Sequence, residues 1–365
     1  MQARKILNKK SYTARKRYTA NKSRKIQHGG VTGGVTGEFH TLLTKVTEIL
    51  NLTTNPLKTD LKITNISDIS SGDYGTVKKA CVKDPHSSTC FTIKFAKTSV
   101  NNNDANEYES AIQMMHHEIY MMHLLDINIP SSSDANIFNK EDCIEQSVGS
   151  ILPPKGTPYL LAEFIQGKTI KNIQADKKIN ESLQPYILYL YSYTLYILLK
   201  IRSFLPGFAH GDLNSGNIFI LEDRNPVSFT FNIVDDEGNG KDMTFNPVPY
   251  HIKIIDFGIS ECTQHNYGGK NPLFKRSNVD VHSIDSFIVM YNFYSISNDE
   301  NKEVLTSLSN MYFGEEITKY LTFTDFGNET VIPLYNMLFE FNNEHTLDEL
   351  FNKALDLIPS SLKSE

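Results

Sequence analysis

The 365 residues are enough for one two-lobed domain or two small domains, and the 40% hydrophobic and 11% aromatic content is typical of a globular protein with a buried core. Charge is uneven: residues 1–36 hold ten Lys/Arg and no Asp/Glu, which leaves 26 basic and 42 acidic residues on the other 329, a formal net charge of −16. A basic arm therefore precedes an acidic body.

The cysteine pattern predicts reduced intracellular thiols and not a disulfide framework, because no Cys-x-x-Cys pair and no zinc-binding spacing is present. The four residues are Cys81, Cys90, Cys143 and Cys262. The chain opens without the apolar core of a signal peptide, so an intracellular, cytoplasmic location is expected. The longest uncharged apolar run, 183–199, is short for a membrane span and contains polar residues. A helix buried in a large lobe is the prediction, with a membrane span as the alternative.

The basic segment at the start of the chain has no sustained apolar periodicity. Residues 1–27 are predicted to be a disordered tail, and a nearly duplicated Gly-rich linker follows up to residue 37. The tail is a candidate for binding nucleic acid or another acidic partner, or for a nuclear address. A solvated tail that aids solubility and a mitochondrial transit peptide are the alternatives.

Strand patterns then give way to helical ones. Strands are expected over 61–66, 75–82, 90–96, 159–164, 228–234, 242–245 and 252–255. Helices are expected over 39–52, 104–125, 182–203, 279–296, 301–313, 330–340 and 346–357. A polar loop is expected over 128–156, and the turn at 235–240 is predicted to be a hairpin tip, because it lacks the ligand spacing of the alternative, a calcium loop. Strands followed by a mostly helical half predict an α+β fold.

Two short motifs carry chemistry. The first is His-Gly-Asp-Leu-Asn-Ser-Gly-Asn over 210–217, and the second is Ile-Asp-Phe-Gly over 255–258, behind a mostly apolar strand. Together they resemble the protein-kinase-like superfamily, and the resemblance extends over about residues 60–360. It implies a bilobal fold in which Asp212 accepts the proton of the acceptor hydroxyl, while Asn217 and Asp256 hold the Mg²⁺ that bridges the ATP phosphates.

Upstream segments match the nucleotide-binding part of that family. The stretch 69–77 resembles the loop over the ATP phosphates, with Ser70 where the family has its first glycine; its predicted contacts are Gly72, Gly75 and Val77. A plain hairpin turn is the alternative. Phe-Thr-Ile-Lys over 91–94 resembles the strand of the ATP lysine, so Lys94 would bind the phosphates and Thr92 would lie over the adenine; Lys97 competes with Lys94. The carboxylate partner of Lys94 is predicted to be Glu118, with Glu107 and Glu109 as alternatives.

The family resemblance also assigns the remaining contacts. The stretch 159–167 resembles the hinge between the lobes, where main-chain groups of Glu163 and Ile165 would contact the adenine edge and Ala162 would leave a roomy back pocket. An ordinary buried strand is the alternative. Phe219 would lie beneath the adenine, and His210 is predicted to pack on Phe257 in a structural role. Asp280 resembles the residue that anchors the catalytic-loop backbone, and a helix cap is its alternative.

The chain departs from the family at three places. Gly211 replaces the Arg that usually precedes the catalytic Asp, so activation by loop phosphorylation loses its electrostatic partner. Asn214 replaces the Lys found in protein Ser/Thr kinases, and the same pattern is shared with small-molecule phosphotransferases. Only 21 residues separate Gly258 from Asp280, without Ala-Pro-Glu. The long hairpin and the short segment resemble divergent kinases of large DNA viruses.

The resemblance leads to the following expectations. Residues 1–37 form the basic tail and linker, 38–163 an N-lobe and 164–365 a helical C-lobe. The expected activity is ATP- and Mg²⁺-dependent protein serine/threonine phosphorylation with a protein substrate. A small-molecule phosphotransferase of the aminoglycoside-kinase-like type and a pseudokinase scaffold are the alternatives. The expected location is the cytoplasm (the host cytoplasm or the virion for a viral protein), with the nucleus as an alternative.

Overall fold

The computed structural model describes most of the chain from residue 63 onwards, namely residues 63–71, 75–83, 88–96, 105–130, 138–151, 158–234, 240–263, 282–323, 333–338 and 346–364. Several predictions fall outside these residues: the tail and linker over 1–37, the helix over 39–52, Gly72 and Asp280. All the described residues belong to one compact unit of the chain.

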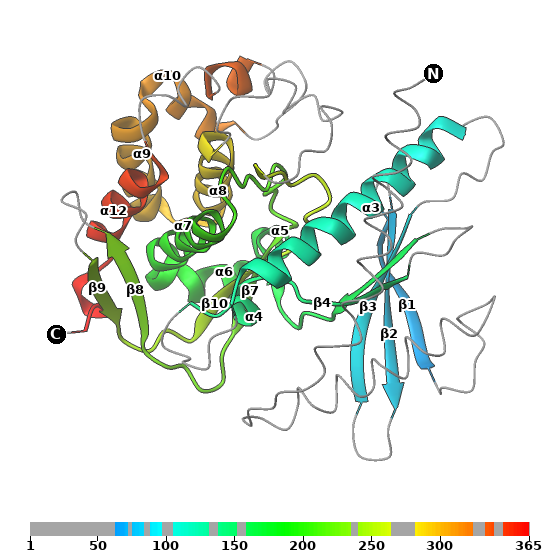
Figure 1. Cartoon of the computed structure of the whole chain (residues 1–365). Coiled ribbons are helices and arrows are strands. Elements are labelled where there is room, and N and C mark those ends of the chain that lie inside the picture. The colour runs from blue at the N-terminus through cyan, green and yellow to red at the C-terminus, as the bar shows by residue number, and fades with distance from the viewer. Residues whose placement is uncertain are drawn as a thin grey trace. The chain divides into compact units, whose positions relative to one another are not determined.

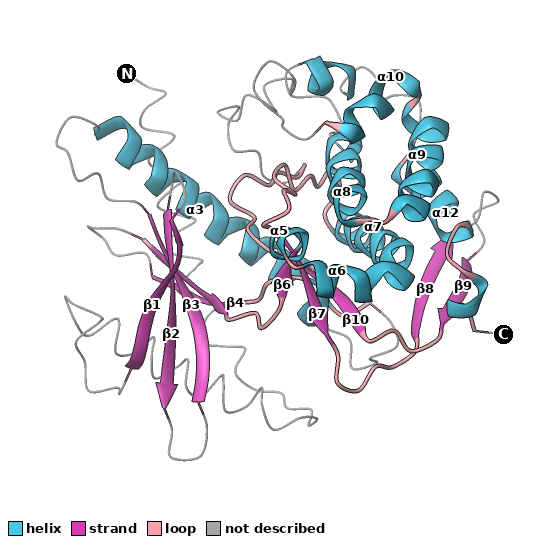
Figure 2. Cartoon of the chain, turned by 180° about the vertical axis from the view of Figure 1, so that it is seen from behind, coloured by secondary structure: helices cyan, strands magenta, loops and turns pink. Residues whose placement is uncertain are grey.

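Five antiparallel strands form a sheet in the first part of the described chain (Figure 2). In the order β1-β2-β3-β5-β4, they are β1 (Ile63–Ser71), β2 (Gly75–Lys83), β3 (Ser88–Ala96), β5 (Tyr159–Glu163) and β4 (Ser147–Ile151). The centre of β3 alternates aromatic, β-branched and Lys residues that are buried on both faces. The helix α3 (Ala105–Asn128) packs against this sheet (Figure 1). The predicted strands over 61–66, 75–82, 90–96 and 159–164 are therefore confirmed within a few residues.

The predicted polar loop over 128–156 is wrong in part, because it contains α4 (Lys140–Cys143) and β4. The sequence of β4, Ser-Val-Gly-Ser-Ile, carries too little apolar alternation to identify a strand. Its conformation comes from antiparallel pairing with β5, in which Ile151 lies opposite Tyr159 and Ser147 lies opposite Ala162. Pairing with a distant strand thus outweighs local composition.

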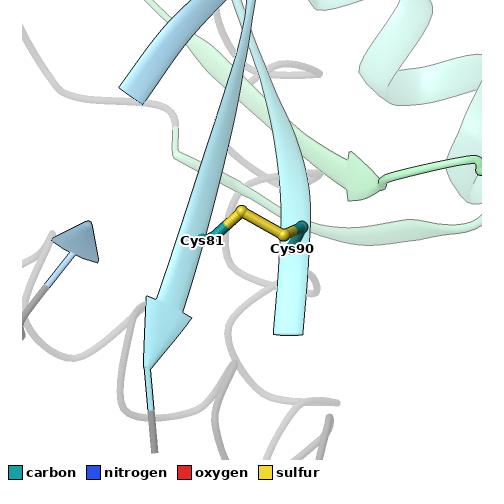
Figure 3. The surroundings of a disulfide bond; sticks show 2 residues. All are labelled: Cys81 and Cys90. Carbon is teal, nitrogen blue, oxygen red and sulfur yellow. A yellow bond between two sulfur atoms is a disulfide. The ribbon is translucent and has the colours of Figure 1, made fainter. Parts of the chain in front are cut away.

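A disulfide bond joins β2 and β3 (Figure 3). Cys81 and Cys90 lie directly opposite each other in the β2–β3 register, with their Cα atoms 4.0 Å apart. The prediction of reduced thiols is therefore wrong for this pair. The prediction was based only on short motif spacings, whereas the β2–β3 hairpin brings together two cysteines that are nine residues apart. Cys143 and Cys262 are free and buried, in agreement with the prediction.

A mostly helical region follows and is built around α7 (Ile187–Phe204). The other helices and 3-10 turns are α5 (Ile170–Ala175), α6 (Lys177–Leu183), η1 (Gln184–Tyr186), α8 (His282–Ile296), α9 (Asp299–Phe313), α10 (Glu315–Thr318), η2 (Lys319–Thr322), α12 (Leu347–Asp356), η3 (Ser360–Leu362) and a helical segment at 333–338. Most of α7 is buried, and its Ser192 and Thr194 hydroxyls donate to carbonyls one turn back. From Ile187 onwards the uncharged run is thus a core helix, as predicted. The predicted helix over 182–203 begins too early, because Leu183 ends α6 and residues 184–186 form η1. In the part of the chain that the structure describes, no helix is long and apolar enough to cross a membrane.

The predicted hairpin after the first motif is present as β8 (Phe229–Val234) and β9 (Gly240–Phe245). Most of its turn lies outside the described residues. Phe231 is fully buried, and its ring centroid lies 4.8 Å from that of Tyr196 on α7, 5.1 Å from that of Phe245 and 5.6 Å from that of Phe351 on α12. This aromatic cluster attaches the hairpin to the helical region, and the hairpin strands lie beside α12 in Figure 1.

A second sheet brings the two sequence motifs together. Its order is β10-β7-β6, with β6 (Lys168–Thr169), β7 (Ile218–Glu222) and β10 (Tyr250–Ile254). Ile218 pairs with Ile254 in an antiparallel register. Because the first motif ends just before Ile218 and the second begins just after Ile254, this pair of strands sets the two motifs side by side. The fold is thus mixed α+β.

Candidate functional site

Lys94 on β3 lies in a buried cluster of opposite charges. Its Nζ atom lies 2.6 Å from Oε1 of Glu118 on α3, 3.3 Å from Oε2 of Glu145 and 3.8 Å from Oδ1 of Asp256. The first three side chains are buried, whereas 46% of the Asp256 side chain is exposed. The predicted pairing of Lys94 with Glu118 is confirmed. The side chains of its competitors lie outside those described: Lys97, Glu107 and Glu109.

The cluster has more acid than base. Burial alone lowers the pKa of Lys94, but the charges of Glu118, Glu145 and Asp256 outweigh it, and the pKa lies well above its ordinary value. Burial also raises the pKa of Glu118 to about 7, and the negative charges of Asp256 and Glu145 add to this effect while Lys94 opposes it. The Lys94 ammonium therefore lies close to three carboxylates and stays charged.

Asp212 has both carboxylate oxygens engaged by neighbouring amides. Asn214 donates through Nδ2 to Oδ1 at 2.8 Å, and Asn217 donates through Nδ2 to Oδ2 at 3.3 Å. Asn217 also donates to the main-chain oxygen of Asp212 at 2.8 Å. Burial raises the pKa of Asp212 to about 6, with a further contribution from the charge of Asp256. The carboxylate is thus oriented and is mainly ionised at neutral pH, as a proton acceptor requires.

His210 is fully buried and links the two motifs. Its Nε2 atom lies 2.9 Å from the carbonyl oxygen of Ile255, and the main-chain N–H of Asp212 donates to Nδ1 at 3.3 Å. These contacts need a neutral ring that donates from Nε2 and accepts at Nδ1. Burial lowers the pKa of His210 to about 4, which favours that neutral form. The ring centroid lies 5.0 Å from that of Phe257, so the predicted packing of His210 on Phe257 is confirmed.

The main chain of the first motif is anchored by Asp285 on α8. Its Oδ2 atom accepts a hydrogen bond from the N–H of His210 at 2.7 Å, and its Oδ1 atom accepts one from the N–H of Gly211 at 3.0 Å. The sequence assigns this anchoring role to Asp280, which lies outside the described residues; the structure gives it to Asp285. Both aspartates occur in one short segment, and motif spacing did not fix which of them faces the loop.

Asp256 has a φ of 65°, the one positive value at a non-glycine residue among those described. This left-handed conformation costs a non-glycine residue about 1–2 kcal/mol. Phe257 is fully buried beside His210. A Cβ atom at Gly258 would lie 3.3 Å from Oδ1 of Asp256. The glycine thus leaves room for the carboxylate, and the phenylalanine fixes the loop beside it.

Four predicted nucleotide contacts share one face of the first sheet. Gly75 and Val77 are two residues apart on β2, and Thr92 and Lys94 are two residues apart on β3, so the members of each pair face the same side. Val77 lies directly opposite Lys94, which places all four on one side of the sheet. A Cβ atom at Gly75 would lie 2.9 Å from the main-chain oxygen of Phe95. The close approach of β3 therefore gives Gly75 a steric reason to be glycine, independent of any phosphate.

The predicted hinge residue Glu163 is held from three directions. Its N–H donates to the carbonyl of Gln146 at 3.1 Å, its carbonyl accepts from the Thr92 hydroxyl at 3.3 Å, and its Oε1 atom accepts from Nζ of Lys253 at 2.7 Å. The N–H of Glu163 is therefore already engaged, whereas its carbonyl takes part in a long hydrogen bond. Two further predicted contacts are partly buried: Ile165 and Phe219.

Asn217 and Asp256 are the predicted metal ligands. Both hydrogen bonds described for the Asn217 side chain use Nδ2, and neither of them engages Oδ1. Amide and carboxylate oxygens suit Mg²⁺, which keeps several waters and needs one or two protein ligands when phosphates supply the others. Within the described residues, no group of three or more His, Cys, Asp or Glu side chains is arranged to hold a metal. The donor atoms of Asn217 and Asp256 are thus of the kind that Mg²⁺ takes when phosphates supply its other ligands.

Sequence reasoning missed three residues that support the site. Glu145 follows α4 in the segment that was predicted to be loop, Lys253 is a buried lysine within β10, and Asp285 lies on α8. The signal for Lys253 was present, because a charged residue inside an apolar strand needs a partner. Glu145 carried no such signal.

No protein-family model matches the chain, and no curated protein matches it significantly. The function is therefore inferred from the residues of the site and from their geometry.

Proposed function

We propose that the chain has a bilobal protein-kinase-like fold and is an ATP- and Mg²⁺-dependent protein serine/threonine kinase. The observation that carries the proposal is the buried Lys94, which is held by Glu118 beside the partly exposed Asp256. In phosphoryl transfer of this type, a strand lysine paired with a helix glutamate and a metal-binding aspartate are both required. The five-stranded sheet with α3 would form the N-lobe, and the helical region would form the C-lobe.

Each side chain has a defined part in the proposed reaction. Lys94 would bind the α/β-phosphates, and Asp256 and Asn217 would hold the metal through oxygen atoms. Magnesium bound there would neutralise charge on the transferred phosphoryl group. Asp212 would orient the acceptor hydroxyl and take its proton, since Asn214 and Asn217 fix both of its oxygens.

A small-molecule phosphotransferase is the second candidate, and a specific observation favours it. Asn214 hydrogen-bonds to Asp212 at the position where protein kinases carry Lys. The neutral amide orients the base but supplies no positive charge to the phosphoryl group. A pseudokinase scaffold has less support, because Lys94, Asp212, Asn217 and Asp256 are all present.

The test is a radiolabelled ATP assay with Mg²⁺ on the full chain. Acceptors are casein, a basic protein, the chain itself and a panel of hydroxylated small molecules. Asp212→Ala and Asp256→Ala are compared with Asp299→Ala, a matched control at an exposed residue of α9.

Label on protein Ser/Thr that disappears in Asp212→Ala and Asp256→Ala but persists in Asp299→Ala is the expected result. ATP consumption with small acceptors alone would move the chain to the second candidate. Metal-dependent ATP binding without turnover would favour the scaffold, and neither binding nor turnover would refute a phosphotransfer function altogether.

A further inference from the structure

The peptide unit between Ile255 and Asp256 is held at both of its polar ends. Its carbonyl oxygen lies 2.9 Å from Nε2 of His210, and its N–H donates to Oε2 of Glu145 at 3.3 Å. This unit leads directly into the positive φ of Asp256. Strained backbone conformations persist where the surrounding structure fixes them from several directions. Two side chains from different parts of the chain do so here.

Glu145 is itself fixed in place by the neighbouring strand. Its N–H donates to the carbonyl of Ile254 on β10 at 2.9 Å, and the preceding residue, Ile144, forms a parallel bridge with the same Ile254. Its side chain is 4% exposed. The main chain of Glu145 is therefore tied to the strand that ends two residues before Asp256, which limits how far its carboxylate can move.

The same carboxylate oxygen of Glu145 also faces Lys94. Oε2 lies 3.3 Å from Nζ of Lys94 and 3.3 Å from the main-chain nitrogen of Asp256. Glu118 approaches the lysine more closely, at 2.6 Å through Oε1. Lys94 thus already has a closer counter-ion, whereas the N–H of Asp256 has its described acceptor in Glu145.

We propose that Glu145 is a positioning residue that fixes the backbone of Asp256, and so sets the direction in which the Asp256 carboxylate meets the metal. This inference rests on the proposed function, because it assigns Glu145 a part in that same site. Glu145 touches neither the metal nor the phosphates in this role. Its oxygen acts through the N–H of Asp256, while His210 acts on the other end of the peptide unit.

Two variants separate the acceptor atom from the charge. Glu145→Gln retains an oxygen that can accept from the Asp256 N–H and removes the charge. Glu145→Leu removes the acceptor in a side chain of similar size. Leu350→Ala, at a fully buried position of α12, serves as a control for general loss of stability. All proteins are studied as the full chain.

The experiment measures Mn²⁺ binding in the presence of ATP, the Mg²⁺ dependence of phosphoryl transfer, and amide hydrogen exchange of the peptide that contains Asp256. For Glu145→Leu we expect metal binding weaker by about 10- to 100-fold, the range found when an outer partner of a metal ligand is removed, together with faster exchange at Asp256. Glu145→Gln should restore most of both properties. Leu350→Ala should lower the melting temperature without changing the metal requirement of the folded fraction.

The outcomes separate the role of Glu145 from the proposed function. If the wild type binds metal and ATP and transfers phosphate, but Glu145→Leu has the same metal requirement and the same exchange rate, the inference is wrong and the proposed function stands. If Glu145→Gln is as impaired as Glu145→Leu, the charge beside Lys94 matters and the hydrogen bond does not, which also overturns the inference. If the wild type shows neither binding nor transfer, both fail.

Discussion

Acidification should destabilise the protein through one buried imidazole, that of His210. Burial lowers its pKa to about 4, whereas an unfolded histidine titrates near about 6.5. Because the folded pKa is the lower of the two, the unfolded chain binds the proton more readily between these values. The stability contributed by neutral His210 is therefore fully present above about pH 6.5 and is lost as the pH falls toward about 4.

The size of this effect follows from the difference in pKa. The folded and unfolded pKa values of His210 differ by about 2.5. At about 1.36 kcal/mol for a difference of one in pKa, this gives about 3 kcal/mol in total. About 2 kcal/mol of this is already lost at about pH 5, where the unfolded histidine is almost fully protonated and the folded one is almost fully neutral.

The assay is urea unfolding of the wild type and of His210→Gln at pH 7, 6 and 5. Glutamine can donate to the carbonyl of Ile255 and does not titrate, so the comparison cancels the titration of other groups. Between pH 7 and pH 5, the wild type should lose about 2 kcal/mol more unfolding free energy than the variant. Equal losses would refute the argument that a neutral His210 is required by the fold.

Three further predictions concern the fold itself. Gly207→Ala should cost about 2–3 kcal/mol in urea unfolding, because Gly207 has a φ of 69° and a Cβ atom there would lie 2.6 Å from Oγ1 of Thr263. Gly314→Ala tests the backbone alone, because nothing lies within 4 Å of a Cβ atom there. Its φ of 80° and ψ of 166° fall in a region that is essentially restricted to glycine, so a cost of about 1–3 kcal/mol is expected, and no measurable loss would refute it. Phe231→Ala should cost about 3–5 kcal/mol by emptying the aromatic cluster under the hairpin, and a cost below about 1 kcal/mol would mean that the hairpin is not packed there. Protein purified without reductant should show two thiols by Ellman titration after unfolding and four after reduction; four thiols before reduction would exclude the disulfide.

The parts of the fold that the sequence predicted are those fixed by local pattern. The apolar run of α7 and the hairpin strands β8 and β9 follow from composition, periodicity and turn residues over short stretches. Asp212 and Asn217 were found because their spacing lies within one loop, and the pairing of Lys94 with Glu118 followed from a family resemblance.

The parts of the fold and the site that the sequence did not predict depend on contacts between distant segments. β4 is a strand because β5 lies beside it, and the cysteine pair is joined because of the β2–β3 register. Glu145 reaches the site through a bridge to β10, which no local pattern records. The choice of Asp285 as the loop anchor depends on how α8 packs against the first motif. Each of these features requires a register or a packing geometry in addition to a residue type.

The charge balance of the site bears on how a phosphate would bind there. Lys94 is the ammonium in contact with Glu118, Glu145 and Asp256, and the charge of Asp256 also reaches Asp212. An anionic phosphate would meet net negative charge in a partly buried setting, where electrostatic interactions are stronger than in water. The proposed nucleotide should therefore bind only together with a cation. In calorimetric titrations, ATP with Mg²⁺ should bind and ATP with EDTA should bind much more weakly. Equal affinity in the two titrations would mean that Lys94 alone compensates the phosphates, and that Asp256 and Asn217 do not hold a metal.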